Sequence, residues 1–194
     1  ARYLHRGAEV RVFDPDPEAE RKIGDVLANA TAAFKMLFGV PPKAGTLSFH
    51  DMLAEAVSGA EIVHESVPER LDLKQRVHAE IAASAPAEAI LCTSTSGLLP
   101  SRIQEGLERP DNLIVAHPFN PVYLLPLVEL VAGQGTAEGV IDRAASIMDS
   151  LGMKPLKVRK EIDAFIADRL LEAVWRESLW PVSYTHLTLP TNRE

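Results

Sequence analysis

The chain has 194 residues, of which 46% are hydrophobic and 24% charged, and its net charge is −7 at pH 7. This length predicts one domain, or one domain and part of another, and the composition excludes a disordered tail, a collagen-like fibre and a disulfide-stapled miniprotein. The acidic balance argues against nucleic acid as the main partner. No apolar run approaches the ~20 residues that cross a bilayer, and the single cysteine, Cys92, favours a reducing compartment. We therefore expect a cytoplasmic protein without a membrane partner or a metal site.

Short apolar strands alternate with longer amphipathic helices along the chain. Residues 1–7 are typical of the last turns of a helix that Gly7 stops. The pattern then predicts, in chain order, a strand over 9–14, a helix over 18–37, a loop over 39–43, a strand over 46–49, a helix over 52–57, a strand over 60–65, a helix over 68–83, a strand over 89–93, a short helix after Pro100, strands over 113–116 and 127–131, a helix over 137–151, a strand over 154–158 and a helix over 163–181.

This alternation predicts an α/β protein. We expect a Rossmann-type, doubly wound and mostly parallel sheet with helices on both faces, and ligands at the carboxyl ends of its strands. Asp14 stands at the end of an early strand, where a dinucleotide fold holds the adenine ribose. A carboxylate accepts hydrogen bonds from ribose hydroxyls and repels a 2′-phosphate, which favours NAD over NADP. The alternative is that Asp14 only forms a turn.

His117 is the strongest candidate for a catalytic residue. It ends a predicted strand, and Pro118 and Pro121 restrict the backbone that follows it. Glu129 comes twelve positions later, in the next strand-like segment. A carboxylate bonded to one ring nitrogen fixes the tautomer and leaves the other nitrogen free to take a proton from an alcohol. The alternative is a histidine with a structural role.

Small hydroxyl residues, Ser94, Thr95 and Ser96, follow another buried strand. Hydroxyls at a strand's carboxyl end suit hydrogen bonds to a substrate oxygen or to a cofactor. They are also common helix caps, which is the alternative for this segment.

Several separated motifs together resemble the 3-hydroxyacyl-CoA dehydrogenase family in order and spacing, over about residues 1–182. They are Glu65-Ser66-Val67-Pro68-Glu69 with Lys74, Ser94-Thr95-Ser96, His117-Pro118-Phe119-Asn120-Pro121 and Leu127-Val128-Glu129. The resemblance implies NAD-dependent oxidation of a secondary alcohol, with His117 as base, Glu129 as its partner, and Ser96 and Asn120 on the substrate oxygen. It also implies that Glu69 and Lys74 lie near the nicotinamide ribose, Asp14 on the adenosine ribose and Ser94 on the cofactor.

The resemblance also sets the expected domain boundaries. We expect 1–160 to be an NAD-binding domain without its first strand and glycine loop, and 161–182 to be the first helix of an all-α C-terminal domain that forms a homodimer in the full-length protein. Residues 183–194 lack periodicity and are expected to be a non-native tail, the alternative being a flexible native one. The chain alone is expected to bind NAD weakly and to be inactive.

One position departs from the acyl-CoA members of the family. Where they carry asparagine in a pattern like G-F-I-x-N-R-L, this chain has Asp168, and an anion suits a cationic substrate better than a thioester. The stretch between Pro15 and Ala60 is also more acidic than basic, which is poor for binding CoA phosphates. Residues 117–129, 161–165 and 175–180 are most similar to the branch of the family that oxidises L-carnitine, a small 3-hydroxy acid with a trimethylammonium group.

A quaternary ammonium has no N–H to donate, so proteins hold it with aromatic faces and nearby anions. The aromatic candidates, each of which has core packing as its alternative role, are Phe119, Tyr123, Phe165, Trp175 and Trp180. Three other functions stay open: a 3-hydroxyacyl-CoA dehydrogenase, an L-gulonate 3-dehydrogenase like the lambda-crystallins, and a structural relative without catalysis.

Overall fold

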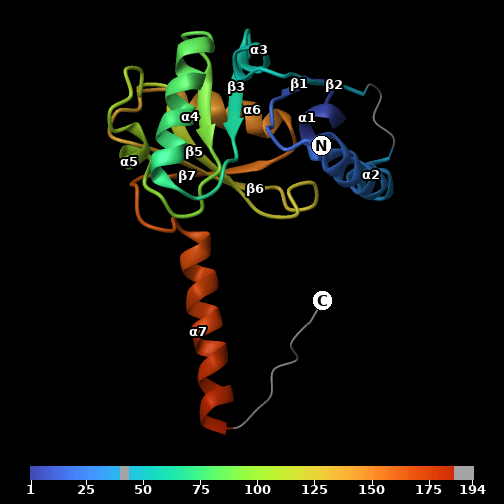
Figure 1. Ribbon diagram of the computed structural model, residues 1–194. Coiled ribbons are helices and arrows are strands. Elements are labelled where there is room, and N and C mark those ends of the chain that lie inside the picture. Colours follow the sequence, from blue (N-terminus) through green and yellow to red (C-terminus); the bar gives the residue numbers. More distant parts are fainter. Residues whose placement is uncertain (40–43, 186–194) are drawn as a thin grey trace.

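A computed structural model describes residues 1–39 and 44–185, the last five as helix backbone alone. The elements in chain order are α1 (Arg2–His5), β1 (Glu9–Val12), α2 (Ala19–Phe38), β2 (Thr46–Phe49), α3 (Leu53–Val57), β3 (Ile62–Glu65), α4 (Leu71–Ser84), β4 (Ile90–Thr93), α5 (Pro100–Gln104), β5 (Leu113–Pro118), β6 (Leu127–Ala132), α6 (Val140–Ser150), β7 (Lys154–Val158) and α7 (Ala167–Thr185) (Figure 1). Residues 40–43 of the predicted loop and 186–194 of the predicted tail lie outside the described residues.

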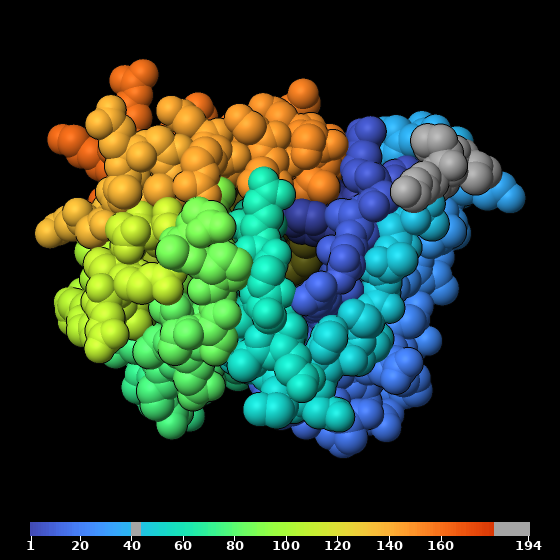
Figure 2. Space-filling view, turned by 90° about the horizontal axis from the view of Figure 1, so that it is seen from above, coloured from blue at the N-terminus to red at the C-terminus, as the bar shows by residue number. Residues whose placement is uncertain are grey.

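The main sheet has the order β3-β4-β5-β6-β7. Strands β3, β4 and β5 are parallel, β6 is antiparallel to β5, and β7 is parallel to β6. The prediction of a mostly parallel Rossmann-like sheet is therefore confirmed. Strands β1 and β2 form a separate parallel pair. In Figure 2 a narrow furrow separates the blue part of the chain around β1 from the teal part around β3.

The central strands are buried because helices cover both of their faces (Figure 1). Successive strand residues point to opposite sides, so Ile90 and Cys92 of β4 pack toward α6, whereas Leu91 packs toward α4 and α5. This arrangement places the segments that follow β3 and β4, together with the end of β5, along one edge of the sheet. None of the described helices has the length and apolar character needed to cross a bilayer.

The last helix begins later, and ends later, than the sequence predicted. Ala164 and Phe165 take left-handed backbone conformations, with φ of 58° and 47°, so the chain turns sharply and α7 starts at Ala167 rather than Asp163. The helix also continues past Pro181 to Thr185, so the first residues of the predicted tail are helical. Figure 1 shows α7 extending away from the sheet.

The buried side chain of Phe165 stabilises this turn. It is 0% exposed and packs with Val115, Val131 and Val158 on the sheet. The structure therefore shows core packing for Phe165, one of the two roles that the sequence left open for it.

Removing the Phe165 ring should destabilise the domain. We expect Phe165→Ala to lower the free energy of unfolding by about 3–5 kcal/mol, because burial and packing are both lost, and Phe165→Leu to lose less than half of that. Urea unfolding followed by circular dichroism measures both values. Equal stability of Phe165→Ala and the parent protein would contradict the packing role.

Candidate active site

The candidate active site is centred on a histidine and a glutamate that face each other across two antiparallel strands. His117 near the end of β5 pairs in register with Glu129 on β6, so both side chains emerge on the same face of the sheet. His117 Nδ1 lies 2.9 Å from Glu129 Oε2, and both residues are buried. With Nδ1–H donating to the carboxylate, Nε2 carries the free lone pair. The structure thus brings together the pair that the twelve-residue spacing predicted.

The second oxygen of Glu129 is also hydrogen-bonded. The backbone N–H groups of Ile166 and Ala167, at the start of α7, both donate to Oε1 at 2.9 Å. The helix N-terminus favours a negative charge at this point. Three N–H donors therefore hold a carboxylate whose side chain is 0% exposed.

The free nitrogen of His117 faces an anion and aromatic rings. Asp168 Oδ2 lies 4.0 Å from His117 Nε2, and the Asp168 side chain is partly exposed. The rings of Phe119 and Phe165 lie 4.8 and 5.7 Å from the imidazole ring, measured between centroids. Asp168 and Phe119 thus join the His117 site, as the sequence predicted, while Phe165 forms its floor.

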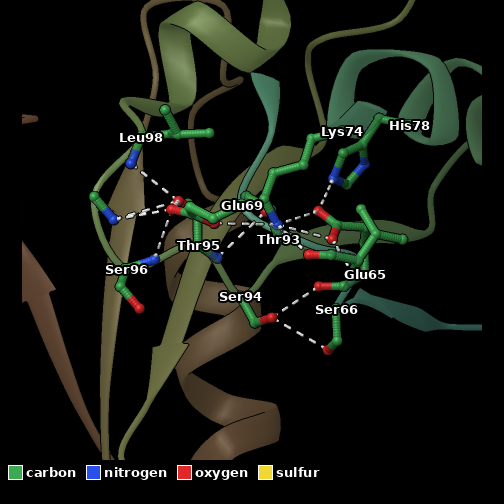
Figure 3. Close-up of polar contacts among 12 residues, drawn as sticks. Glu65, Ser66, Glu69, Lys74, His78, Thr93, Ser94, Thr95, Ser96 and Leu98 are labelled. Atoms are coloured by element: carbon green, nitrogen blue, oxygen red, sulfur yellow. Dashed lines mark hydrogen bonds and ion pairs between the residues drawn. The ribbon is translucent and has the colours of Figure 1, made fainter. Parts of the chain in front are cut away.

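A loop that follows β4 lies at the same sheet edge and is organised by Glu69 (Figure 3). Glu69 Oε1 accepts hydrogen bonds from the Thr95 hydroxyl and from the N–H groups of Ser96 and Gly97. Partial burial raises the pKa of Glu69, but the Thr95 hydrogen bond and the Lys74 charge outweigh that effect and hold the pKa below its ordinary value. The Ser96 hydroxyl is exposed and points away from this network.

Beneath Glu69 lies a buried ion pair between Glu65 and Lys74. Lys74 Nζ is 2.9 Å from Glu65 Oε1 and 3.5 Å from Glu69 Oε2, and it donates to the Val67 carbonyl at 3.1 Å. The Lys74 side chain is 1% exposed, and its ion pair with Glu69 lets it support that exposed residue from the interior. The predicted place of Lys74 near the nicotinamide ribose stays a prediction.

His78, one turn after Lys74 on α4, completes the buried network. Its Nε2 lies 3.2 Å from Glu65 Oε2, while its buried Nδ1 has no hydrogen-bond partner. Burial raises the pKa of Glu65, but hydrogen bonds from His78, Lys74 and Thr93 more than compensate and lower the pKa to about 2. Sequence reasoning missed the roles of Thr95 and His78. The spacing of Lys74 and His78, which places both on one helix face, was the available signal for His78.

The remaining predicted residues are less closely assembled. Asp14 is exposed two residues after β1, and its Oδ1 accepts a hydrogen bond from Asp16 N at 2.9 Å, so it does form a turn. Ser94 Oγ donates within the protein, to the Glu65 carbonyl at 3.0 Å and to Ser66 Oγ at 3.1 Å. Asn120 is exposed, and its peptide bond to Pro121 is cis.

The other aromatic candidates do not gather around His117. Tyr123 is half-buried in the loop between β5 and β6. Trp175 is 57% exposed and lies two helical turns, about 10 Å, beyond Asp168 along α7. Trp180 lies further along the same helix. The structure therefore does not bring Trp175 or Trp180 to the predicted site. Within the described ranges, no group of three or more His, Cys, Asp or Glu side chains could hold a metal ion.

The low pKa of Glu65 predicts how stability changes in acid. The folded pKa of about 2 lies below the ordinary 4.5, so the unfolded chain binds more protons between these values, and stability falls as pH drops from 4.5 toward 2. Glu65→Gln should flatten this dependence. It should also lower stability at pH 7 by about 3–5 kcal/mol, because Lys74 loses its buried partner.

Urea unfolding at a series of pH values measures both effects. Glu61→Gln, at an exposed acid just before β3, is the matched control and should keep the parent's pH dependence. If Glu65→Gln and the parent lose stability equally between pH 4.5 and 2, the charge assigned to Glu65 is wrong.

Comparisons with known proteins identify the family of this chain. Residues 1–162 match the family described as 3-hydroxyacyl-CoA dehydrogenase, NAD binding domain. The chain is 60% identical over 183 residues to an L-carnitine dehydrogenase/betainyl-CoA thioesterase of Ruegeria pomeroyi, and 56% identical over 182 residues to an L-carnitine dehydrogenase of Mesorhizobium japonicum. These matches include 94% and 93% of this chain. They span only 38% and 50% of the length of the two relatives.

Solved structures show the same fold. An NAD+-dependent dismutase, 5-formyl-3-hydroxy-2-methylpyridine 4-carboxylic acid 5-dehydrogenase, matches with a TM-score of 0.89 and 29% identity, over 96% of this chain and 61% of that one. A diketoreductase matches with a TM-score of 0.86 and 26% identity, over 96% and 68% of the two chains. The chain therefore belongs to the 3-hydroxyacyl-CoA dehydrogenase family, and residues 1–162 correspond to its NAD-binding domain.

Proposed function

We propose that the full-length protein that carries this chain oxidises L-carnitine to 3-dehydrocarnitine with NAD, and that His117 is the general base. The observation that carries the proposal is the position of Asp168, whose carboxylate lies 4.0 Å from His117 Nε2. In L-carnitine the hydroxyl and the trimethylammonium group are on neighbouring carbons, so a base and an anion this close can serve one substrate. The identity to L-carnitine dehydrogenases supports the same substrate.

His117 acts on the substrate hydroxyl through Nε2. Its Nδ1–H donates to Glu129, which fixes the tautomer, and the buried carboxylate stabilises the imidazolium once Nε2 has taken the proton. In the proposal, Ser96 and Asn120, both exposed near the strand ends, orient the substrate oxygen. NAD, when bound, supplies the two-electron acceptor.

The residues at the strand ends fit the riboses of a dinucleotide. Ribose hydroxyls need acceptors, and Asp14 and Glu69 present exposed carboxylates after the parallel strands β1 and β3. We propose that these two residues hold the ribose hydroxyls, that Lys74 positions Glu69, and that Ser94 steadies the adjoining loop through its bonds to Ser66 and Glu65.

Recognition of the ammonium group falls to Asp168 and to the Phe119 ring beside His117, with Tyr123 as a further candidate in the same loop. We also propose that 161–185 begins a second, α-helical domain and that the full-length protein is a cytoplasmic homodimer. The exposed apolar side chains of α7 support a contact surface there; they include Leu170, Leu171, Val174 and Leu179.

Replacing the base should abolish most of the activity. In the full-length protein we expect His117→Ala to lower kcat for L-carnitine by about 10²–10⁴-fold, because proton removal loses its acceptor. NADH formation measured by absorbance tests this, with His50→Ala, a histidine just after β2, as the matched control. Near-normal turnover of His117→Ala would remove His117 from the mechanism.

The charge at position 168 should decide the substrate. We expect Asp168→Asn to lower kcat/KM for L-carnitine by about 10- to 100-fold, because the trimethylammonium group loses its anion. Activity toward uncharged alcohols should not fall. Rates with L-carnitine, 3-hydroxybutyryl-CoA and L-gulonate separate the candidates. Asp163→Asn, at an exposed acid in the preceding segment, is the control. Activity with the thioester alone would defeat the carnitine proposal.

A further inference from the structure

The carboxylate that orients His117 is itself held by a different part of the chain. Glu129 Oε2 receives the imidazole N–H, whereas Oε1 receives the N–H groups of Ile166 and Ala167, all at 2.9 Å. Ile166 is the residue just before α7, since its carbonyl accepts the first helical hydrogen bond, from Leu170 N. One side chain therefore connects the imidazole on β5 to the first turn of α7.

The segment that leads to these donors is held in an unfavourable conformation. Left-handed backbone is unfavourable at a residue with a side chain, and Ala164 and Phe165 both adopt it, with φ of 58° and 47°. This conformation directs the Phe165 ring into the sheet and brings the next two N–H groups onto Glu129. The cost is offset only while these contacts persist.

A second anchor fixes the start of the same segment. Glu161 accepts hydrogen bonds from Ser101 N at 3.1 Å and from Ser101 Oγ at 2.6 Å, which ties it to the first turn of α5. Residues 161–167 are thus attached to the sheet domain at three points. Glu161 binds Ser101, Phe165 packs on the sheet, and the N–H groups of 166–167 bind Glu129. The Glu129 attachment is the one that also contacts the proposed base.

We propose that the seating of α7 orients the catalytic pair: the amides of Ile166 and Ala167 are positioning groups, and release of this segment frees Glu129 and, with it, the ring of His117. A buried carboxylate oxygen without donors is unfavourable, so a carboxylate that loses them reorients to accept other hydrogen bonds. It then no longer presents Oε2 to Nδ1 in a fixed direction. This inference rests on the proposed function of His117, but its physical core, the coupling between α7 and the imidazole, is measurable without catalysis.

The sharpest test removes one donor and leaves the helix intact. Proline is tolerated at the first helical position, so Ala167→Pro in the full-length protein deletes the N–H that Glu129 uses. Ala167→Gly keeps that N–H and is the matched control. We expect kcat for L-carnitine to fall at least about 10-fold in Ala167→Pro, with KM changed less than about twofold. Ala167→Gly should stay within about twofold of the parent in both constants.

A readout independent of turnover is the ¹⁵N NMR signal of the His117 imidazole. The parent should show a protonated Nδ1 in a strong hydrogen bond, and Ala167→Pro should broaden or shift that signal while Ala167→Gly preserves it. Equal kcat in Ala167→Pro and the parent, or an unchanged imidazole signal, overturns the coupling. If His117→Ala keeps its activity, the proposed function fails, but the imidazole signal still decides the coupling.

A second variant covers the case in which Ala167→Pro does not fold. Ser101→Ala weakens the anchor at Glu161 without touching Glu129 or His117. We expect faster hydrogen exchange at the Ile166 and Ala167 amides together with a change in the His117 signal. Faster exchange with an unchanged imidazole signal would contradict the proposal.

Discussion

The buried carboxylate of Glu129 is the constraint around which the rest of this structure is arranged. An ionised side chain away from water is tolerated only when its oxygens are met by donors, and Glu129 meets three, from segments 12 and 37 positions away in sequence. The antiparallel pairing of β5 with β6 supplies the first donor. The left-handed turn before α7 supplies the other two. A shift of one residue in the β5–β6 register would turn Glu129 to the opposite face and remove all of them.

A second buried carboxylate, Glu65, supports the neighbouring loop in a different way. Its partners include the side chains of Lys74 and His78, which lie one helical turn apart on α4, and the N–H group of Val67. Through Lys74 the charge network reaches Glu69, and through Glu69 it reaches the loop that carries Ser96. The two sides of the candidate site thus rest on two networks, one centred on Glu65 and one on Glu129.

The sequence predicted the strands and the central pair well, for identifiable reasons. Short runs of strand-forming residues identify the strands, and β2 and β7 begin and end where the pattern placed them. The spacing of His117 and Glu129 brackets a strand, a loop and a strand, so a cross-strand contact followed. Contacts made by main-chain N–H groups have no side-chain signature, and the donors to Glu129 were missed for that reason.

Other errors came from tertiary contacts that override local pattern. Helical spacing from Asp163 onward concealed a turn that forms because Phe165 packs against valines of the sheet. The burial of Lys74 also depends on tertiary contact, because its ammonium group pairs with the buried carboxylate of Glu65. Trp175 shares the periodicity of Asp168, but a helix that leads away from the sheet separates the two along its axis.

The use of backbone donors at the start of α7 has a consequence for how such a protein can be recombined. Main-chain N–H groups are the same for every residue except proline, so the anchor on Glu129 places little demand on which side chains occupy positions 166 and 167. A foreign helical segment spliced at this junction would preserve the geometry of the His117–Glu129 pair while bringing different side chains to its surroundings. One NAD-binding domain could in this way be joined to many different C-terminal segments. The residues around the His117–Glu129 pair could then vary while the pair itself is kept.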